Sequence, residues 1–481
     1  MTLRVYNTLS REKETLVTRE PGKVAAYVCG VTPYSRSHIG HARPSIVWDT
    51  IRRYLGYKGY EVFAVQNFTD IDDKIIAASA REGIPFRELA DKYSAEYLES
   101  MDMLKVRRAD MYPRATDHIA DIIEMIETLV KKGHAYPSGG DVYFDVSSFE
   151  GYGKLSRRSP EDMMAGARVD PGEKKDDPMD FALWKGAKPG EPSWDSPWGL
   201  GRPGWHIECS AMSVRYLGDG FDMHGGGTDL IFPHHENEIA QSEAYTGRAP
   251  FVRYWLHNEL VNLKGEKMSK SIGNIITVQE ILGRFAPEVI RLTMLSAHYR
   301  SSLEMSDESI EAAEKGWRKL EGARDNARAY IRGSGAKPDA GAEISVNARR
   351  RFEEAMDDDF NTGLAIGVLF DLARDINSAV SEGHGSGRGK VEVIAGALDT
   401  LEELAGIMGI LRDADTKDRN AEGDSAEIAD ALISIILDLR ESARNKRDWE
   451  TSDAIRSRLA ELGFVIEDTP HGPRWKKERR E

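Results

Sequence analysis

The chain has 481 residues, of which 40% are hydrophobic and 30% are charged, and its formal net charge is −15; this length predicts about three domains. No apolar stretch approaches the roughly 20 residues that a membrane helix needs. The negative net charge argues against a protein that coats nucleic acid electrostatically, although one RNA could still dock on a local basic face. Two cysteines in so long a chain exclude a disulfide framework, and with an N-terminus that shows no secretory signal they predict a cytoplasmic protein whose cysteines are metal ligands or catalysts.

The first part of the chain alternates strand-like and helix-like segments. Residues 24–28 have the apolar pattern of a buried strand, and residues 60–65 are again strand-like. Helical periodicity covers residues 42–55, with Gly56 as the expected stop, and residues 86–103. Alternation of this kind predicts an α/β fold with a parallel sheet covered by helices.

The pattern changes between residues 116 and 200. A strong helix is expected over residues 117–132 and a short strand over residues 142–146, followed by a charged, loop-rich stretch. We interpret this region as an insertion within the α/β fold. The sheet pattern resumes near Trp205 and continues to about Leu263.

The last part of the chain is expected to be mainly helical from about residue 306. Just before it, Thr277 and Glu280 form a capping box that predicts the start of another helix. Polar, glycine-rich breaks occur at residues 333–343 and 383–389, and a third break at residues 413–425 separates a final module.

The sequence His38-Ile39-Gly40-His41 follows a predicted strand and precedes a predicted helix. A helix N-terminus presents free N–H groups and partial positive charge to phosphate, and two imidazoles there can stabilise charge that develops in a transition state. The alternative is two surface histidines near a turn. The motif alone does not decide between them.

A second phosphate-binding candidate is Lys267-Met268-Ser269-Lys270-Ser271, which lies between Gly265 and Gly273. Its lysines offer point charges for a triphosphate, and its glycines offer mobility. Alone, it is typical of an ordinary basic surface loop. Its position downstream of the histidine motif and of a strand pattern favours a role in phosphate binding.

A candidate metal site combines Cys29, Cys209, His234 and Glu238. His234 and Glu238 are four residues apart and share a helix face, whereas His235 and Glu236 are expected to point elsewhere, as supporting or surface groups. Two thiolates, an imidazole and a carboxylate suit Zn²⁺. A carboxylate ligand favours an ion with a functional role over an ion in a closed structural site. The alternative is two buried thiols and a surface pair on a helix.

Four further segments allow both a functional and a structural interpretation. The glycine-rich turn at residues 224–229 ends in an acid that could accept a ribose hydrogen bond, or it is a tight loop without a ligand. The acidic turn at residues 67–74 is explained nearly as well by helix capping. Trp205 and His206 could be core residues, and the basic residues between Arg474 and Arg480 are more typical of a solvated tail than of an RNA-binding face.

Taken together, these motifs resemble the cysteinyl-tRNA synthetase family of class I aminoacyl-tRNA synthetases. The resemblance covers essentially the whole chain and depends on long matching segments at residues 204–210 and 232–243, on the two phosphate motifs, and on residues 356–362. It implies one Zn²⁺ per chain at Cys29, Cys209, His234 and Glu238. It also implies ATP contacts, with Mg²⁺, at His38, His41, Gly227, Asp229 and Lys270, and an amino-acid pocket lined by Thr69, Trp205 and His206.

The resemblance also implies the domain organisation. A Rossmann-like catalytic domain would comprise residues 1–115 and 200–255, with an inserted connective subdomain at residues 116–199. It would be followed by a stem-contact region (256–310), an α-helical bundle (311–415) and a small mixed α/β anticodon-binding module (426–481).

The implied reaction is the activation of L-cysteine by ATP and its transfer to the 2′-hydroxyl of the terminal adenosine of tRNA(Cys). His38 and His41 would stabilise charge on the phosphates, Lys267 and Lys270 would hold the β- and γ-phosphates, and zinc would select the substrate thiolate. The expected protein is a monomer without a membrane partner. The alternatives are a ligase that passes activated cysteine to an amino sugar, a non-catalytic RNA-binding relative, and a zinc hydrolase, which the missing His-Glu-x-x-His pattern disfavours.

Overall fold

The computed structural model forms two compact units, residues 1–411 and 412–481. It describes residues 2–158, 174–263, 266–267, 276–383 and 389–411 of the first unit, and residues 436–437, 439–444, 446, 448–461, 464–469 and 472–477 of the second. None of the helices in these ranges is both long and apolar enough to cross a bilayer.

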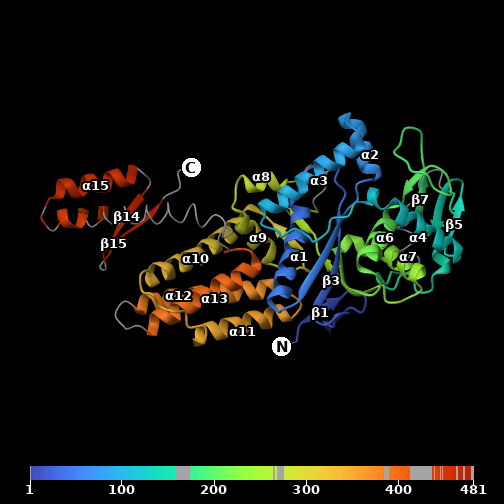
Figure 1. Ribbon diagram of the computed structural model, residues 1–481. Helices are drawn as coiled ribbons and strands as arrows, with labels where there is room; N and C mark the ends of the chain where they lie inside the picture. The colour runs from blue at the N-terminus through green and yellow to red at the C-terminus, as the bar shows by residue number, and fades with distance from the viewer. Residues whose placement is uncertain are drawn as a thin grey trace. The chain divides into compact units, whose positions relative to one another are not determined.

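A four-stranded parallel sheet forms the centre of the first unit (Figure 1). In spatial order its strands are β10 (Val252–Asn258), β9 (Phe221–Gly227), β3 (Lys23–Val31) and β4 (Glu61–Phe68). All three neighbouring pairs are parallel, which confirms the predicted parallel sheet. Because the strands are parallel, their carboxyl ends meet at one edge, where Cys29 lies close to the glycine-rich end of β9.

Helix α1 (Ile39–Tyr57) connects β3 to β4 and begins at the first histidine motif. It starts three residues earlier than predicted and runs past Gly56. Trp48 of this helix packs directly on β9, and a Cβ atom at Gly225 would lie 1.9 Å from its ring. A glycine at this position of β9 therefore allows the helix to approach the sheet.

Two helices follow β4, α2 (Asp73–Glu82) and α3 (Phe86–Met103), and α3 has the predicted bounds. The acidic turn before α2 acts as a helix cap, because the Asp72 carboxylate accepts a hydrogen bond from the backbone N–H of Lys74 at 2.8 Å. An additional hairpin at the start of the chain consists of β1 (Arg4–Asn7) and β2 (Glu12–Thr15).

The insertion between β4 and β9 has a sheet and a core of its own. Helix α4 (Ile119–Lys131) lies within the predicted helix. The sheet is antiparallel, with strands β5 (Ala135–Ser138), β6 (Asp141–Phe144), β7 (Phe181–Gly186) and β8 (Gly201–Pro203). Strand β7 replaces part of the stretch expected to be loops, and β8 lies just after it. Helices α6 (Trp205–Leu217) and α7 (Glu236–Thr246) contact α4 and contribute side chains to this core.

Beyond β10 the chain forms a small sheet around the second phosphate motif. Its strands are β11 (Val261–Leu263), β12 (Glu266–Lys267) and β13 (Leu303–Met305), and the helices between them are α8 (Val278–Leu282) and α9 (Pro287–Leu295). The predicted capping box is confirmed at the start of α8: the N–H of Thr277 donates to Glu280 at 2.8 Å, and the N–H of Glu280 donates to the Thr277 hydroxyl at 3.2 Å.

Four helices complete the first unit as a bundle (Figure 1). They are α10 (Asp307–Ile331), α11 (Glu343–Asp357), α12 (Thr362–Gly383) and α13 (Gly389–Met408). The break predicted at residues 333–343 separates α10 from α11. Of the second break, residues 384–388 lie outside the described residues. One hydrophobic cluster runs from Leu3 through the sheet to Leu411.

The second unit contains helix α15 (Trp449–Glu461) and a hairpin of β14 (Phe464–Thr469) and β15 (Gly472–Lys477). Arg474, Lys476 and Lys477 lie in β15, so the backbone of this basic run is a strand and not an unstructured tail. Arg479 and Arg480, and the break predicted at residues 413–425, lie outside the described residues.

Candidate active site and metal centre

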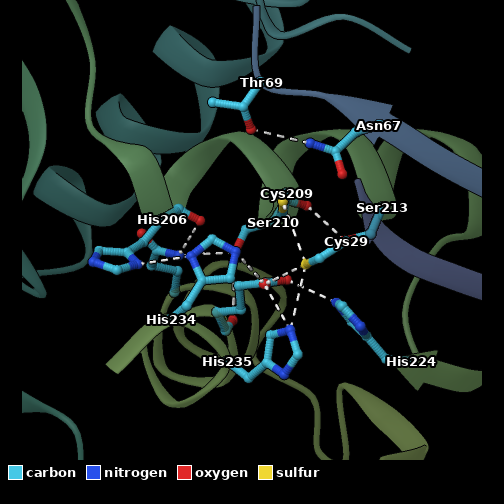
Figure 2. Close-up of polar contacts among 12 residues, drawn as sticks. Cys29, Asn67, Thr69, His206, Cys209, Ser210, Ser213, His224, His234 and His235 are labelled. Atoms are coloured by element: carbon cyan, nitrogen blue, oxygen red, sulfur yellow. Dashed lines mark hydrogen bonds and ion pairs between the residues drawn. The ribbon is translucent and has the colours of Figure 1, made fainter. Parts of the chain in front are cut away.

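The four predicted metal ligands come from a strand of the sheet, two helices and the turn that precedes one of these helices. Cys29 is near the end of β3, Cys209 is on α6, Glu238 is in the first turn of α7, and His234 is in the irregular turn that precedes α7. One ligand atom of each residue lies within 4.8 Å of the others. The structure therefore brings together two cysteines that are 180 residues apart in the sequence, and Figure 2 shows His234 and His235 directed toward them.

The distances between these donor atoms fit a tetrahedral zinc ion. With Zn–S bonds of about 2.3 Å and Zn–N or Zn–O bonds of about 2.0 Å, tetrahedral geometry separates two sulfurs by about 3.8 Å and a sulfur from an oxygen by about 3.5 Å. The two Sγ atoms of Cys29 and Cys209 are 3.7 Å apart, and Cys29 Sγ lies 3.6 Å from Glu238 Oε1. His234 Nε2 lies 3.0 Å from the same oxygen. The residues thus fit zinc in both donor type and spacing.

A second set of donors overlaps the first and was not predicted. It shares Cys29 and Glu238 but adds His224 and His235. His235 Nε2 is 3.3 Å from Cys29 Sγ, and His224 Nε2 is 2.9 Å from Glu238 Oε2. The fit of this set to one ion is poorer, because His235 Nε2 is 3.9 Å from Glu238 Oε1.

Of the two roles expected for His235 and Glu236, supporting groups or surface groups, the surface role is wrong. Both side chains are buried. Glu236 accepts hydrogen bonds from the backbone N–H groups of Leu155 at 3.2 Å and Ser156 at 2.7 Å, and so fixes the chain of the insertion against α7. The expectation assumed that residues 234–238 form one regular helix, in which neighbouring side chains point in different directions. The wide turn before α7 instead directs both neighbouring histidines inward.

The charges at this centre favour a bound cation. Burial by itself would raise the pKa of Glu238, but His224 and His234 lower it to about 2. The hydrogen bond from Cys29 lowers the pKa of Cys209 to about 6, while burial raises that of Cys29. Burial opposes protonation of His234, yet Glu238 and Cys209 raise its pKa to about 10. An ion that replaced the proton on His234 would satisfy the thiolate and the carboxylate together.

The residues predicted to bind the amino acid lie on two sides of this centre. The ring of Trp205 stacks on that of His234, with centroids 4.5 Å apart, and 39% of the residue is exposed. His206 Nδ1 is 2.9 Å from His234 Nδ1. Thr69 accepts a hydrogen bond from Asn67 at 3.3 Å (Figure 2). An amino acid whose side chain reached the ligands would therefore meet an aromatic wall and several polar groups.

A cavity of about 310 Å³ opens at the carboxyl edge of the sheet. Its lining includes five predicted site residues: Cys29, His38, His41, Gly227 and Asp229. The two imidazoles stack at the start of α1, with ring centroids 3.8 Å apart. Because Cys29 also belongs to the metal cluster, the cavity joins the predicted phosphate site to the predicted metal site.

The second phosphate motif is described only in part. Lys267 lies in β12, which pairs antiparallel with β11, but its side chain lies outside the described residues, as does all of Lys270. The segment that precedes the motif in the chain borders the cavity, because Asn258, Glu259, Leu260 and Val261 line it.

Comparisons with known proteins agree over the whole chain. The family "tRNA synthetases class I (C) catalytic domain" matches residues 15–315, the "DALR domain" matches residues 351–412, and the "Cysteinyl-tRNA ligase anticodon binding domain" matches residues 431–475. The chain is 54% identical to the cysteine–tRNA ligase of Heliobacterium modesticaldum and 52% identical to that of Pelotomaculum thermopropionicum, in each case over 99% of this chain and 100% of the relative.

Solved structures with low sequence identity share the fold. Methionyl-tRNA synthetase of Mycobacterium tuberculosis, bound by methionyl-adenylate, matches with a TM-score of 0.60 and 16% identity over 81% of this chain and 92% of that one. A leucyl-tRNA synthetase complex of Agrobacterium radiobacter matches with a TM-score of 0.58 and 12% identity over 82% of this chain and 86% of that one. These likenesses support the predicted Rossmann-like fold class.

Proposed function

The chain belongs to the cysteinyl-tRNA synthetase family, and from this premise we propose that Cys29, Cys209, His234 and Glu238 hold one zinc ion that identifies the side chain of cysteine. The enzyme activates cysteine with ATP and charges tRNA with it. The observation that carries the proposal is that the four donor atoms lie within 4.8 Å of one another, with a sulfur–sulfur and a sulfur–oxygen distance close to the edges of a zinc tetrahedron.

Selectivity is the reason for a metal at this position. Serine differs from cysteine only by oxygen in place of sulfur, and rejecting it by a factor of 10⁴–10⁵ requires roughly 5.5–7 kcal/mol. A pocket that reads shape alone cannot supply this difference. A bound zinc ion supplies a Lewis acid that favours a thiolate and accepts a neutral hydroxyl poorly.

Around that ion, the chain's own residues would hold the amino acid. Trp205 would cover the side-chain pocket by stacking on His234, and His206 would hold the His234 ring through its Nδ1 atom. Thr69, held by Asn67, would contact the amino acid from the β4 side.

The ATP site would be the cavity at the start of α1. His38 and His41 would stabilise charge on the phosphates of Mg·ATP, and Gly227 and Asp229 would approach the nucleoside from the end of β9. Lys270, together with Lys267, would hold the β- and γ-phosphates. Stacking of the two imidazoles fixes them side by side at the helix N-terminus.

The reaction then needs no covalent protein intermediate. A carboxylate oxygen of cysteine attacks the α-phosphorus, forming the C–O–P bond of cysteinyl-adenylate, and the bond to the β-phosphate oxygen breaks to release pyrophosphate. In the second step the terminal 2′-hydroxyl of tRNA attacks the acyl carbon and AMP leaves. The rate would come from positioning and from charge stabilisation by the imidazoles and lysines.

The test is ATP–pyrophosphate exchange with cysteine and with serine, before and after removal of zinc. We expect strong exchange with cysteine only, and loss of the preference after the ion is removed and measured by elemental analysis. Strong serine-dependent exchange by the protein with one zinc per chain would contradict the thiolate proposal, although the ligase activity itself would stand.

The acceptor of the activated amino acid follows from the end of the chain. A ligase that served an amino sugar would not need an anticodon-binding domain, and this family domain matches here. We further propose that the protein is a cytoplasmic monomer. Light scattering across a concentration series would contradict a monomer if the mass doubled.

A further inference from the structure

Arg43 is a buried cation on α1 that no role assigned so far explains. It lies two residues after His41, has no exposed surface, and lines the same cavity as the two imidazoles. Within the described residues no carboxylate pairs with it. Its guanidinium donates instead to four backbone carbonyls, those of Glu259 at 2.9 Å, Leu260 at 2.8 Å, His298 at 3.3 Å and Ser301 at 2.5 Å.

The first two carbonyls lie at the start of the strand that leads to the second phosphate motif. Glu259 and Leu260 immediately precede β11, and β11 pairs with the strand that contains Lys267. After the motif, the chain returns to the start of α1, where Ile39 N–H donates to the carbonyl of Ile276 at 3.1 Å. The segments on both sides of the lysine motif are thus bonded to the first turns of the helix that carries the histidines.

The other two carbonyls belong to a turn that is held from its opposite side. In this turn, the Tyr299 hydroxyl donates to Asp359 at 2.8 Å and Arg300 Nε donates to the same carboxylate at 2.7 Å. Asp359 follows α11 of the bundle, and Tyr299 also accepts from the backbone N–H of Glu259 at 2.9 Å. Arg43 and Asp359 therefore clamp one turn between the catalytic helix and the bundle.

Only arginine has the chemistry for this arrangement. Its planar guanidinium offers five donors and no acceptor, so that one group can bond carbonyls on two separate segments. Burial lowers the pKa of Arg43 to about 10, so the group remains charged at neutral pH. A lysine at this position would keep the charge, but its single ammonium group cannot reproduce the fork.

We propose that Arg43 is a positioning residue for cysteine activation: its bonds to Glu259, Leu260 and the turn at residues 298–301 fix the wall of the cavity that precedes the lysine motif against the helix that carries His38 and His41. The proposal rests on the phosphate-binding roles proposed above for the two motifs. Since the β- and γ-phosphates are present only during activation, a change in this spacing slows activation more than transfer.

The test compares Arg43→Lys with the unchanged protein in two separate steps. Because a misplacement of about 1 Å can cost about 100-fold in rate, we expect kcat for cysteine-dependent ATP–pyrophosphate exchange to fall by roughly that factor. The KM for cysteine and the zinc content should stay unchanged, because the proposed metal ligands lie on β3, α6, α7 and the turn before α7, and not on α1. Transfer to tRNA from added cysteinyl-adenylate should keep nearly its original rate.

Arg53→Lys is the matched control, because Arg53 is also buried on α1 and hydrogen-bonded, to Asp49 at 2.8 Å and to the carbonyl of Lys105 at 2.9 Å. This variant should lower the melting temperature without separating the two steps. If Arg43→Lys does not fold, Asp359→Asn loosens the same turn from the other side and should give the same separation.

Two outcomes overturn the inference: equal slowing of activation and transfer, or an activation rate in Arg43→Lys equal to that of the unchanged protein. If the unchanged protein itself shows no cysteine-dependent exchange, the proposed function fails rather than the role of Arg43.

Discussion

Two adjacent histidines, His234 and His235, present their Nε2 atoms to the same ligand cluster. Each ring is held through Nδ1 by a different histidine: His206 lies 2.9 Å from His234, and His257 lies 2.7 Å from His235. Such outer contacts orient metal-binding imidazoles and fix their tautomers. The donor distances favour His234 as the ligand, so the two residues form a natural pair of test positions.

We expect His234→Ala to weaken zinc binding by more than the 10–100-fold typical of losing an outer-shell partner, and to raise the KM for cysteine. His235→Ala should retain one zinc per chain, because His235 belongs to the donor set with the poorer fit. Zinc affinity is measured by competition with a chromophoric chelator. If His235→Ala lost zinc and His234→Ala retained it, the ion would instead be assigned to the second donor set, which contains His224.

At the residue scale, the sequence identified side chains by their chemistry but not all of their neighbours. The cysteines, His234 and Glu238 were selected as candidate ligands, and the structure brings them together. His235 was expected to be a supporting or surface group, and His224 and His257 were not selected. A usable signal existed for His224, since it opens the glycine-rich turn at the end of β9. No local pattern marks His257, because its importance depends on a contact between β10 and the turn before α7.

At the scale of elements, α1 connects the sheet to the rest of the first unit. Asp49 of this helix accepts hydrogen bonds from Arg53 at 2.8 Å and from Arg291 of α9 at 2.7 Å. Arg291 in turn donates to the carbonyl of Met408 at the end of α13. One buried carboxylate thus links the catalytic helix to α9 and to the bundle.

Asp49→Asn should destabilise the first unit by about 3–5 kcal/mol at neutral pH, because it leaves two buried arginines without their counter-charge. Burial would raise the pKa of Asp49, but Arg291 and Arg53 lower it overall. A lowered pKa means that this stabilisation is present above the unfolded value of about 3.9 and is lost as the pH falls through the folded value. The difference in free energy of unfolding between the variant and the unchanged protein should therefore become smaller at acidic pH.

Urea unfolding of the two proteins at several pH values measures this difference. Asp102→Asn is the control, since its ion pair with Arg108 is exposed and should contribute less than about 1 kcal/mol. A destabilisation by Asp49→Asn that stayed constant down to strongly acidic pH would show that charge is not its cause.

The elements that sequence periodicity found are the long, amphipathic or uniformly apolar ones. Helix α3 was predicted to the residue, and β3 and β4 were found within a few residues. Strands β7 and β8 were missed because they are short and rich in glycine, tryptophan and proline, without alternation. Their strand geometry comes from pairing with β6 and with each other.

At the scale of the whole molecule, the catalytic sheet and the bundle share one hydrophobic core. Leu3, Trp48, Ile290, Leu369 and Leu404 all belong to the same buried cluster. The bundle is therefore packed as part of the first unit and not attached by a linker. The second unit has a small cluster of its own, in which Leu437 and Leu459 are the buried members.

A chain that ends at residue 411 should keep the first unit folded, since the core of that unit is complete without the rest. We expect cysteine-dependent ATP–pyrophosphate exchange close to that of the full chain, and a KM for tRNA raised at least about tenfold, equal to about 1.4 kcal/mol of binding free energy. Aminoacylation kinetics with tRNA transcripts measure the change. An unchanged KM for tRNA would argue against anticodon binding by the second unit.

The sequence by itself determined the family and the α/β class, and it located the two candidate phosphate motifs and the donor residues of the candidate metal centre. These features are visible in short contiguous sequence motifs or in the local periodicity of apolar residues. Only the tertiary structure decided that His235 faces inward, that Arg43 bonds four carbonyls, and that Asp49 joins three elements. Each of these depends on segments that lie far apart in the chain and meet only when the strands pair and the helices pack, so no spacing along the sequence encodes them.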